Sequence, residues 1–291
     1  MKKILTVVLA CTLLVFFAAG CANNGASETQ NGADKTIQLG YVNWAEGIAM
    51  TNLAEAILED KMGYKVESTA ADVAPLFTSL ASGNTDAFLD CWLPLTHEDY
   101  MKEYGDKIDD LGYNYEGAII GLVVPDYVEI DSIEQLNANK EAFNGQIIGI
   151  DSGAGIMRAT ERAIPEYGLE YELVTGSGPA MTAALGKAID NKESIVVTGW
   201  TPHWKFARWD LKFLEDPKNI YGSSENIHTV TRKGFSEDMP EVAEFFRNMK
   251  FTDDQLGSLM GAVEEATDPL EAAREWMNEN EELVNSWIPG E

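Results

Sequence analysis

The chain has 291 residues, and 45% of them are hydrophobic, which is enough to build the cores of one large or two medium domains. Its 48 acidic and 21 basic residues give a formal net charge of −27. This charge excludes binding to nucleic acid or to anionic lipid through the general field of the surface.

The N-terminus has the features of an export signal. Two lysines precede an apolar run, residues 4–17, which is too short to span a bilayer in the mature protein. Ala18-Ala19-Gly20-Cys21 resembles a bacterial lipobox, although Ala18 stands where leucine is commonest. We expect residues 1–20 to be a signal peptide and residues 21–35 to be a lipidated cysteine and a flexible tether. The alternative is an ordinary secretory signal that happens to precede a cysteine.

The cysteines agree with this location. Cys11 is removed with the signal and Cys21 is acylated, so Cys91 is the one cysteine left and no intramolecular disulfide can form. No later stretch approaches the ~18 consecutive apolar residues of a spanning helix. The expected location is therefore the extracellular face of the cell membrane, with attachment through lipid.

From Thr36 onward, short apolar runs alternate with helical periods. The first block predicts, in chain order, a strand over 37–44, a helix over 47–62, a strand over 64–68, a helix over 72–82, a strand over 85–92, a helix over 96–104 and a strand over 115–124.

The second block repeats this alternation. It predicts a short helix from 131–132, a strand over 146–150, a loop over 151–155, a helix over 156–167, a strand over 172–175, a helix over 178–191, and strands over 194–200 and 227–232. Residues 239–287 are expected to be mostly helical, with a break near Asp268-Pro269.

Alternating strands and helices indicate an α/β fold with parallel sheets covered by helices. The strands over 117–125 and 226–232 are expected to cross between two lobes. We predict residues 36–124 plus 226–291 as the first lobe and 125–225 as the second. Ligands in open α/β sheets bind beyond the carboxyl ends of strands, which here lie at a cleft between the lobes.

Three tryptophans, Trp44, Trp92 and Trp200, end predicted strands in both lobes. One such tryptophan alone would be interpreted as a core residue, but the shared position in three strands favours a common site. The remaining tryptophans are expected to pack under Trp200 (Trp204 and Trp209) or in the C-terminal helical core (Trp276 and Trp287).

Several indoles suit a quaternary ammonium group, which has no N–H to donate and carries its charge on an apolar methyl shell. Aromatic faces bury the methyl groups and attract the diffuse charge, with each contact contributing about 0.5–2 kcal/mol. Three or four such contacts are sufficient for micromolar binding after the cost of ordering.

A zwitterion also needs an anion site. The turn from Asp151 to Ile156 leads from a strand into a helix, where free N–H groups hold a carboxylate and glycines allow close approach. A plain tight turn is the alternative. His97 follows the Trp92 segment and could donate to the same carboxylate, although a lone histidine is more often a surface or capping residue. Arg158 stands where a dinucleotide fingerprint needs its third glycine.

At these residues the chain resembles the glycine betaine/proline betaine binding proteins of ABC importers. The matching pieces are Gly-Tyr-Val-Asn-Trp44, Leu-Asp-Cys-Trp92-Leu-Pro-Leu-Thr-His97, Ile-Gly-Ile-Asp-Ser-Gly-Ala-Gly155-Ile156-Met and Thr-Gly-Trp200-Thr-Pro-His-Trp204. The resemblance implies a two-lobe, type II periplasmic-binding-protein fold that closes about a hinge.

The resemblance also implies the site. Trp44, Trp92 and Trp200 form the cage, and the backbone N–H groups of Gly155 and Ile156, with the side chain of His97, hold the carboxylate. Tyr115 or Tyr41 could complete the cage, because relatives for choline or carnitine sometimes use tyrosine.

The function implied is that of a monomeric substrate-binding lipoprotein. It captures glycine betaine, and proline betaine as well, for osmoprotection and delivers it to a membrane permease, with no catalytic residue, cofactor or metal. A choline or carnitine binding protein is the nearest alternative. A metal-binding lipoprotein is disfavoured, since His97, His203 and His228 show no paired spacing. A hydrolase using Cys91 and His97 lacks any known nucleophile motif.

Overall fold

A computed structural model describes residues 36–290 of the chain. The predicted signal peptide, the tether and the acylation site at Cys21 lie outside the described residues. The described residues fall within one compact unit. None of the helices in this part of the chain has both the length and the apolar character needed to cross a membrane.

The nine strands of the described residues are hydrogen-bonded into one sheet; eight lie in the order β2-β1-β3-β9-β4-β7-β5-β6, and β8 pairs with β4 outside this order. Their bounds are β1 Thr36–Tyr41, β2 Lys65–Ala70, β3 Ala87–Leu93, β4 Ile108–Pro125, β5 Gln146–Ile148, β6 Glu172–Val174, β7 Val197–Thr201, β8 Leu211–Phe213 and β9 Glu225–Arg232. Strand β1 is parallel to β2 and β3, and β5 is parallel to β6 and β7, which confirms the predicted α/β class.

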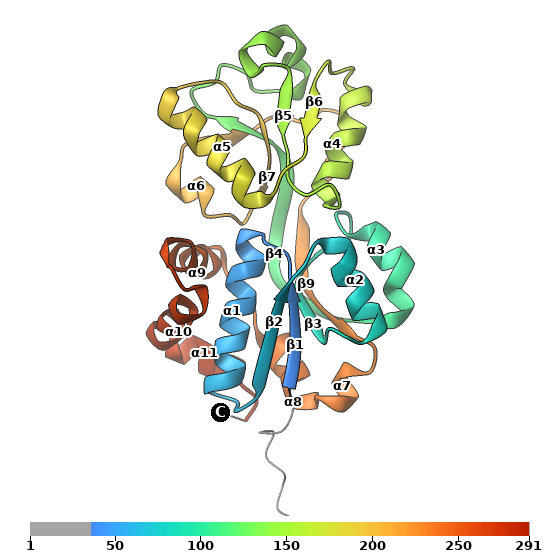
Figure 1. The fold of residues 1–291 in the computed structure, drawn as a ribbon, viewed down its shortest axis with the longest axis vertical. Helices are drawn as coiled ribbons and strands as arrows, with labels where there is room; N and C mark the ends of the chain where they lie inside the picture. The colour runs from blue at the N-terminus through green and yellow to red at the C-terminus, as the bar shows by residue number, and fades with distance from the viewer. Residues whose placement is uncertain (1–35, 291) are drawn as a thin grey trace, which may run out of the picture. The chain divides into compact units, whose positions relative to one another are not determined.

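Strands β4 and β9 are antiparallel neighbours that join two parts of the fold (Figure 1). The first half, as named here, holds β1–β3, β9 and the helices α1 Ala45–Asp60, α2 Val73–Ser82, α3 Glu98–Tyr104, α7 Phe235–Asp238, α8 Pro240–Asn248, α9 Asp253–Glu265, α10 Pro269–Glu279 and α11 Glu281–Trp287. The second half holds β5–β8 and the helices α4 Gly155–Glu166, α5 Gly178–Asn191 and α6 Lys205–Arg208. Short 3₁₀ turns cover Gly105–Lys107, Ile133–Gln135 and Asn137–Phe143.

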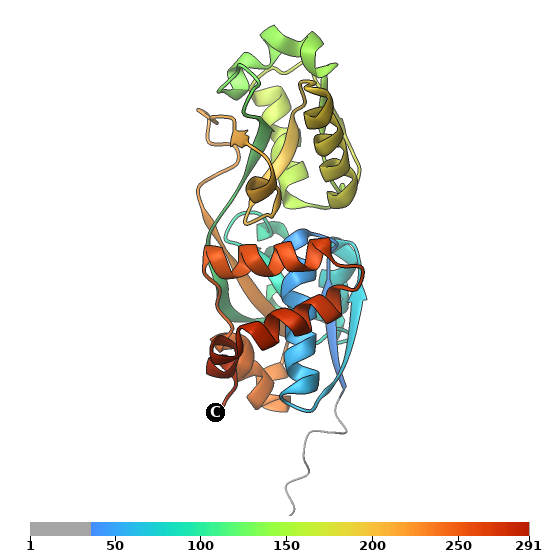
Figure 2. The same ribbon diagram turned by 90° about the vertical axis from the view of Figure 1, so that its left-hand side faces the viewer.

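The C-terminal helices complete the first half. Figure 2 shows α9 and α10 lying across one side of α1, and both helices pack against it. The predicted break at Asp268-Pro269 is confirmed, because the Asp268 side chain caps α10 and Pro269 occupies its first position. Trp276 and Trp287 are buried there, as predicted for core residues.

Two predicted strand boundaries are wrong. Strand β1 ends at Tyr41, and Trp44 is the N-cap residue of α1 rather than the end of a strand. Strand β4 begins at Ile108, not at residue 115, since it continues through register shifts around Gly112 and Gly117. Both glycines have positive φ (101° and 88°), a conformation that ordinary strand residues avoid and that breaks the alternating pattern.

The short strand β8 was not predicted. Its three residues pair with the end of β4, where Pro125 aligns with Leu211. Strand β4 pairs with β9 up to Ala118 and with β7 from Ile119 onward, so the chain passes from the first half to the second within this strand.

Candidate ligand-binding site

One pocket gathers the three predicted cage tryptophans. Trp44, Trp92 and Trp200 line it together with the predicted Gly155 and Ile156. The other lining residues are Glu46, Thr96, Ile120, Ile150 and Ala154. The cavity left between these residues is about 20 Å³, so the aromatic rings nearly fill the pocket in this structure.

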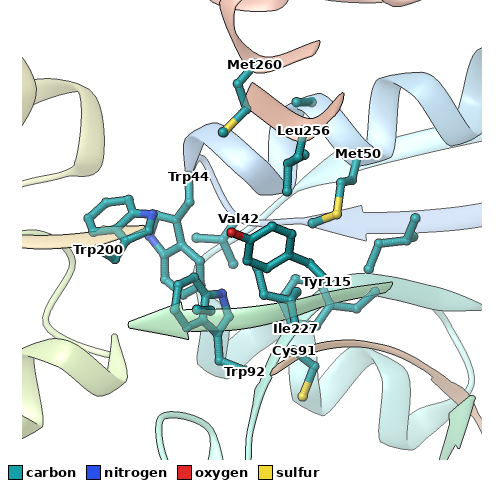
Figure 3. Packing of buried hydrophobic residues seen from close by; sticks show 14 of the residues in the cluster. Val42, Trp44, Met50, Cys91, Trp92, Tyr115, Trp200, Ile227, Leu256 and Met260 are labelled. Atoms are coloured by element: carbon teal, nitrogen blue, oxygen red, sulfur yellow. The ribbon is translucent and has the colours of Figure 1, made fainter. Parts of the chain in front are cut away.

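The three indoles come from different elements and from both halves (Figure 3). Trp44 precedes the first turn of α1, Trp92 lies in β3, and Trp200 lies in β7 of the second half. Their exposed fractions are 5%, 2% and 3%, although indole rings are seldom fully buried in folded proteins. The site is thus a desolvated aromatic enclosure that needs both halves.

Each indole N–H donates to a carboxylate. The pairs are Trp44 Nε1 to Asp151 Oδ2 at 3.0 Å, Trp92 Nε1 to Asp90 Oδ1 at 2.7 Å and Trp200 Nε1 to Glu46 Oε2 at 2.8 Å. A hydrogen bond at each ring N–H fixes the plane of that ring. The three acidic residues were not predicted.

Two of these acceptors are almost completely buried. Burial raises the pKa of Glu46 to about 7, against the lowering effects of its bond from Trp200 and of nearby Lys205. Burial, and then the nearby charge of Glu46, raise the pKa of Asp90 well above its usual range. The first half therefore holds two acidic groups beside the cage whose charge is disfavoured by their surroundings.

A buried lysine lies on the other side of Trp200. Lys205 Nζ is 4.2 Å from the Trp200 ring centroid, and burial lowers the pKa of this amine to about 7. The charge of Glu46 opposes that lowering. Trp200 is therefore oriented both at its N–H and over its ring face.

Gly155 and Ile156 form the first turn of α4, where backbone N–H groups have no acceptor within the helix. A Cβ on Gly155 would lie 2.1 Å from the Thr96 carbonyl oxygen of the first half. Only glycine allows this approach, and the close packing brings the start of α4 against the Trp92–His97 segment. These N–H groups are suited to holding an anion.

His97 does not line the pocket directly but stacks on Trp44, with ring centroids 5.8 Å apart and an angle of 12°. Its Nδ1 accepts from the backbone N–H of Trp92 at 2.9 Å, and burial lowers the pKa of the ring to about 3. The ring is therefore neutral with its proton on Nε2. That buried nitrogen has no hydrogen-bond partner among residues 36–290, so it is a donor available beside the cage.

Other predicted aromatic residues lie elsewhere. Neither Tyr115 nor Tyr41 lines the pocket, and the Tyr115 hydroxyl donates to Asp253 at 3.0 Å. The layer behind Trp200 begins with His203, whose ring is 5.0 Å from it, rather than with a tryptophan. The next rings outward are Trp204, 5.2 Å from His203, and Trp209, 5.6 Å from Trp204.

The alternative sites considered from the sequence find no support. Within residues 36–290 no group of three or more His, Cys, Asp or Glu side chains is placed to hold a metal ion. Cys91 is a buried free thiol, and burial raises its pKa well above the usual range, which disfavours a thiolate nucleophile.

Comparisons with known proteins agree with this geometry. The family model described as the substrate-binding domain of ABC-type glycine betaine transport systems (OpuAC) matches residues 35–279. The glycine betaine/carnitine transport binding protein GbuC of Listeria monocytogenes serotype 1/2a (strain 10403S) is 48% identical over 153 residues, or 52% of this chain. That match spans about half (51%) of the Listeria protein.

Two solved structures are similar over most of the chain. Lactococcal OpuAC, in a closed-liganded conformation with glycine betaine, is 38% identical with a TM-score of 0.81, over 88% of this chain and all of that one (100%). The glycine betaine, L-proline binding protein ProX of Borrelia burgdorferi is 39% identical with a TM-score of 0.84, over 88% and 97% of the two chains.

These similarities confirm the predicted type II periplasmic-binding-protein fold. They also confirm the prediction that the chain belongs to a family of transport binding proteins rather than of enzymes. The chain belongs to the family of substrate-binding domains of ABC-type glycine betaine transport systems.

Proposed function

We propose that this protein binds glycine betaine, and proline betaine by the same groups, and delivers it to the permease of an ABC importer for osmoprotection. The observation that carries the proposal is the meeting of three indoles from two halves with the start of α4 in one small pocket. That combination offers aromatic faces to a methylated cation and free N–H groups to a carboxylate.

The cation and the anion have separate partners in this scheme. The trimethylammonium group lies among the rings of Trp44, Trp92 and Trp200, with about 0.5–2 kcal/mol from each desolvated contact. The carboxylate accepts from the N–H groups of Gly155 and Ile156 and from Nε2 of His97. Choline lacks a carboxylate and leaves these donors unpaired, which costs affinity in a buried site.

Both halves contribute to the ligand's surroundings, so the ligand stabilises their closed arrangement through its higher affinity for it. The closed form of the monomer is the species that the membrane permease recognises. No covalent step is involved, and release follows when the halves separate.

We also propose that Cys21 carries a lipid that holds the protein on the extracellular face of the cell membrane. The support is the lipobox-like segment before Cys21 and the export signal preceding it. Cys21→Ser should release the protein from the membrane fraction into the medium. Mass spectrometry of the mature N-terminus showing an unmodified Cys21 would contradict the anchor.

The ligand is tested by calorimetric titration of the purified protein with glycine betaine, proline betaine, carnitine and choline. Glycine betaine should bind in the micromolar range or tighter, and choline at least tenfold more weakly. Tightest binding of carnitine would favour the second candidate, which the name of the Listeria relative supports. Absence of heat with all four compounds would contradict a methylammonium site.

A further inference from the structure

Two of the three indole–carboxylate bonds run between the halves of the protein, in opposite directions. Trp44 of the first half donates to Asp151, which precedes α4 of the second half. Trp200 of the second half donates to Glu46 in the first turn of α1. One cage ring of each half is therefore oriented by an acceptor of the other half.

The third bond lies within the first half. Trp92 donates to Asp90, two residues away on the same strand, so this ring keeps its acceptor when the halves separate. The three bonds are alike in chemistry and similar in length, and they differ in whether they cross the cleft. This contrast separates the effect of holding a ring from the effect of joining the halves.

We propose that Asp151 and Glu46 are positioning residues that form the cage and join the halves through the same two bonds. Each bond exists only when the halves meet, because donor and acceptor belong to different halves. A ligand that needs oriented rings therefore needs closure, and separation of the halves frees two of the three rings at once. The inference rests on the proposed function for its ligand, but not for its effect on closure.

Burial makes these bonds effective. Glu46 is 1% exposed, and the Trp200 ring that donates to it is 3% exposed. In such surroundings a donor or acceptor that loses its partner is strongly disfavoured unless water reaches it, and water reaches this pair only when the halves part. The pair therefore favours either full closure or full separation over intermediate positions.

Other contacts cross the cleft without touching the cage rings. The Tyr100 hydroxyl donates to the Gly153 carbonyl at 2.9 Å, and Arg158 donates to the Thr96 carbonyl at 3.2 Å. These contacts contribute to closure as well, so loss of one indole bond should shift the equilibrium between open and closed forms without abolishing closure.

The test measures closure without any ligand. Single-molecule energy transfer, with one dye on α9 and one on α4 of the purified protein, gives the closed fraction. Asp151→Ala and Glu46→Ala should each lower the ligand-free closed fraction at least threefold. Asp151→Asn and Glu46→Gln keep an acceptor oxygen and should stay near the wild-type value. The matched control is Ser258→Ala, which removes the acceptor of the Trp276 indole within the first half, outside the cage, and should leave the ligand-free closed fraction unchanged.

A second readout uses glycine betaine in stopped-flow fluorescence. The two alanine variants that lose cross-half acceptors should release ligand at least tenfold faster with little change in association rate. Equal closed fractions in these variants and in Ser258→Ala would overturn the inference even if wild-type protein binds betaine. If the wild type binds no methylammonium compound but closure still falls in both variants, the proposed ligand is wrong and the role of the two acceptors stands.

Discussion

Trp92 and Trp200 show two ways of holding a ring in the same site. Trp92 lies in a strand in which six of seven residues are buried, its indole is bonded to Asp90 in that strand, and its backbone N–H is bonded to His97 five residues later. Trp200 also lies in a buried strand, but its indole acceptor is Glu46, 154 positions away in the other half. The wall of the cage formed by Trp92 is complete within its half. The wall formed by Trp200 has its indole acceptor only when the halves meet.

This difference distinguishes the part of the site that is preorganised from the part that forms when the halves close. A wall built from one strand contributes the same contact to the ligand in open and closed forms, so it sets the initial encounter. A wall that needs both halves contributes only in the closed form, and this is the kind of interaction through which a ligand shifts a conformational equilibrium.

The largest effect is expected from Gly155→Ala. The new Cβ would meet the Thr96 carbonyl at 2.1 Å, across the boundary between the halves, and the backbone on both sides cannot yield. We expect betaine affinity to fall by about 100-fold or more, roughly 2.7 kcal/mol. Calorimetry measures the affinity, and thermal unfolding should show a folded protein. Gly153→Ala is the control, because its Cβ would lie no closer than 3.3 Å to any side chain. Near-normal affinity of Gly155→Ala would show that closure does not require this packing.

Trp200→Ala should weaken betaine binding by more than tenfold, roughly 1.4 kcal/mol or more. The substitution removes a face of the cage and the donor to Glu46 together. Trp200→Phe keeps an aromatic ring but lacks the N–H, so its betaine affinity should lie between those of Trp200→Ala and the wild type. Trp204→Phe changes a ring that does not line the pocket and should bind normally. Unchanged affinity of Trp200→Ala would remove this ring from the proposed site.

Glu46, the buried acceptor of the Trp200 indole, should make the free energy of unfolding depend on pH. Because the pKa of Glu46 is raised from 4.5 to about 7, the folded state holds its proton more tightly than the unfolded state. The group's favourable contribution is complete below pH 4.5 and is lost as pH rises through about 7. Glu46→Gln lacks this loss, so its melting temperature relative to wild type should increase from pH 4.5 to pH 8.

Thermal unfolding of both proteins across this range measures the difference. The exposed Asp126→Asn substitution is the control, and its difference from wild type should stay flat. A Glu46→Gln difference that is constant with pH would show that the carboxylate titrates normally in the folded protein.

The smallest effect is expected from Asp90→Asn. An amide oxygen still accepts from Trp92, and the substitution replaces a buried carboxyl group whose second oxygen has no hydrogen-bond partner among residues 36–290. Betaine affinity should stay within about threefold of wild type, and stability should not decrease. A loss above tenfold, measured by calorimetry, would mean that the wall on β3 depends on the carboxyl group of Asp90 and not only on the oxygen that accepts from Trp92.

Much of the fold was predictable because its signals are local. The apolar periods, the Asp268-Pro269 cap and Gly83, which ends α2 with φ of 76°, all act within a few residues. The start of β4 was missed for the same reason: two glycines with positive φ interrupt its alternation, and its partner β9 lies more than 100 positions away in sequence.

The sequence by itself determined the kinds of groups in the site. Three indoles at the ends of buried segments, a glycine turn leading into a helix and a histidine near Trp92 were all readable from residue type and spacing. Only the tertiary structure decided the acceptors. Glu46 is two residues from Trp44 in sequence, yet Trp44 bonds to Asp151, 107 positions away, and Glu46 accepts from Trp200. Spacing along one segment sets which way a side chain points, but a hydrogen bond between segments depends on which loops the fold brings together. Burial in the folded protein then sets the charge of Glu46 and His97.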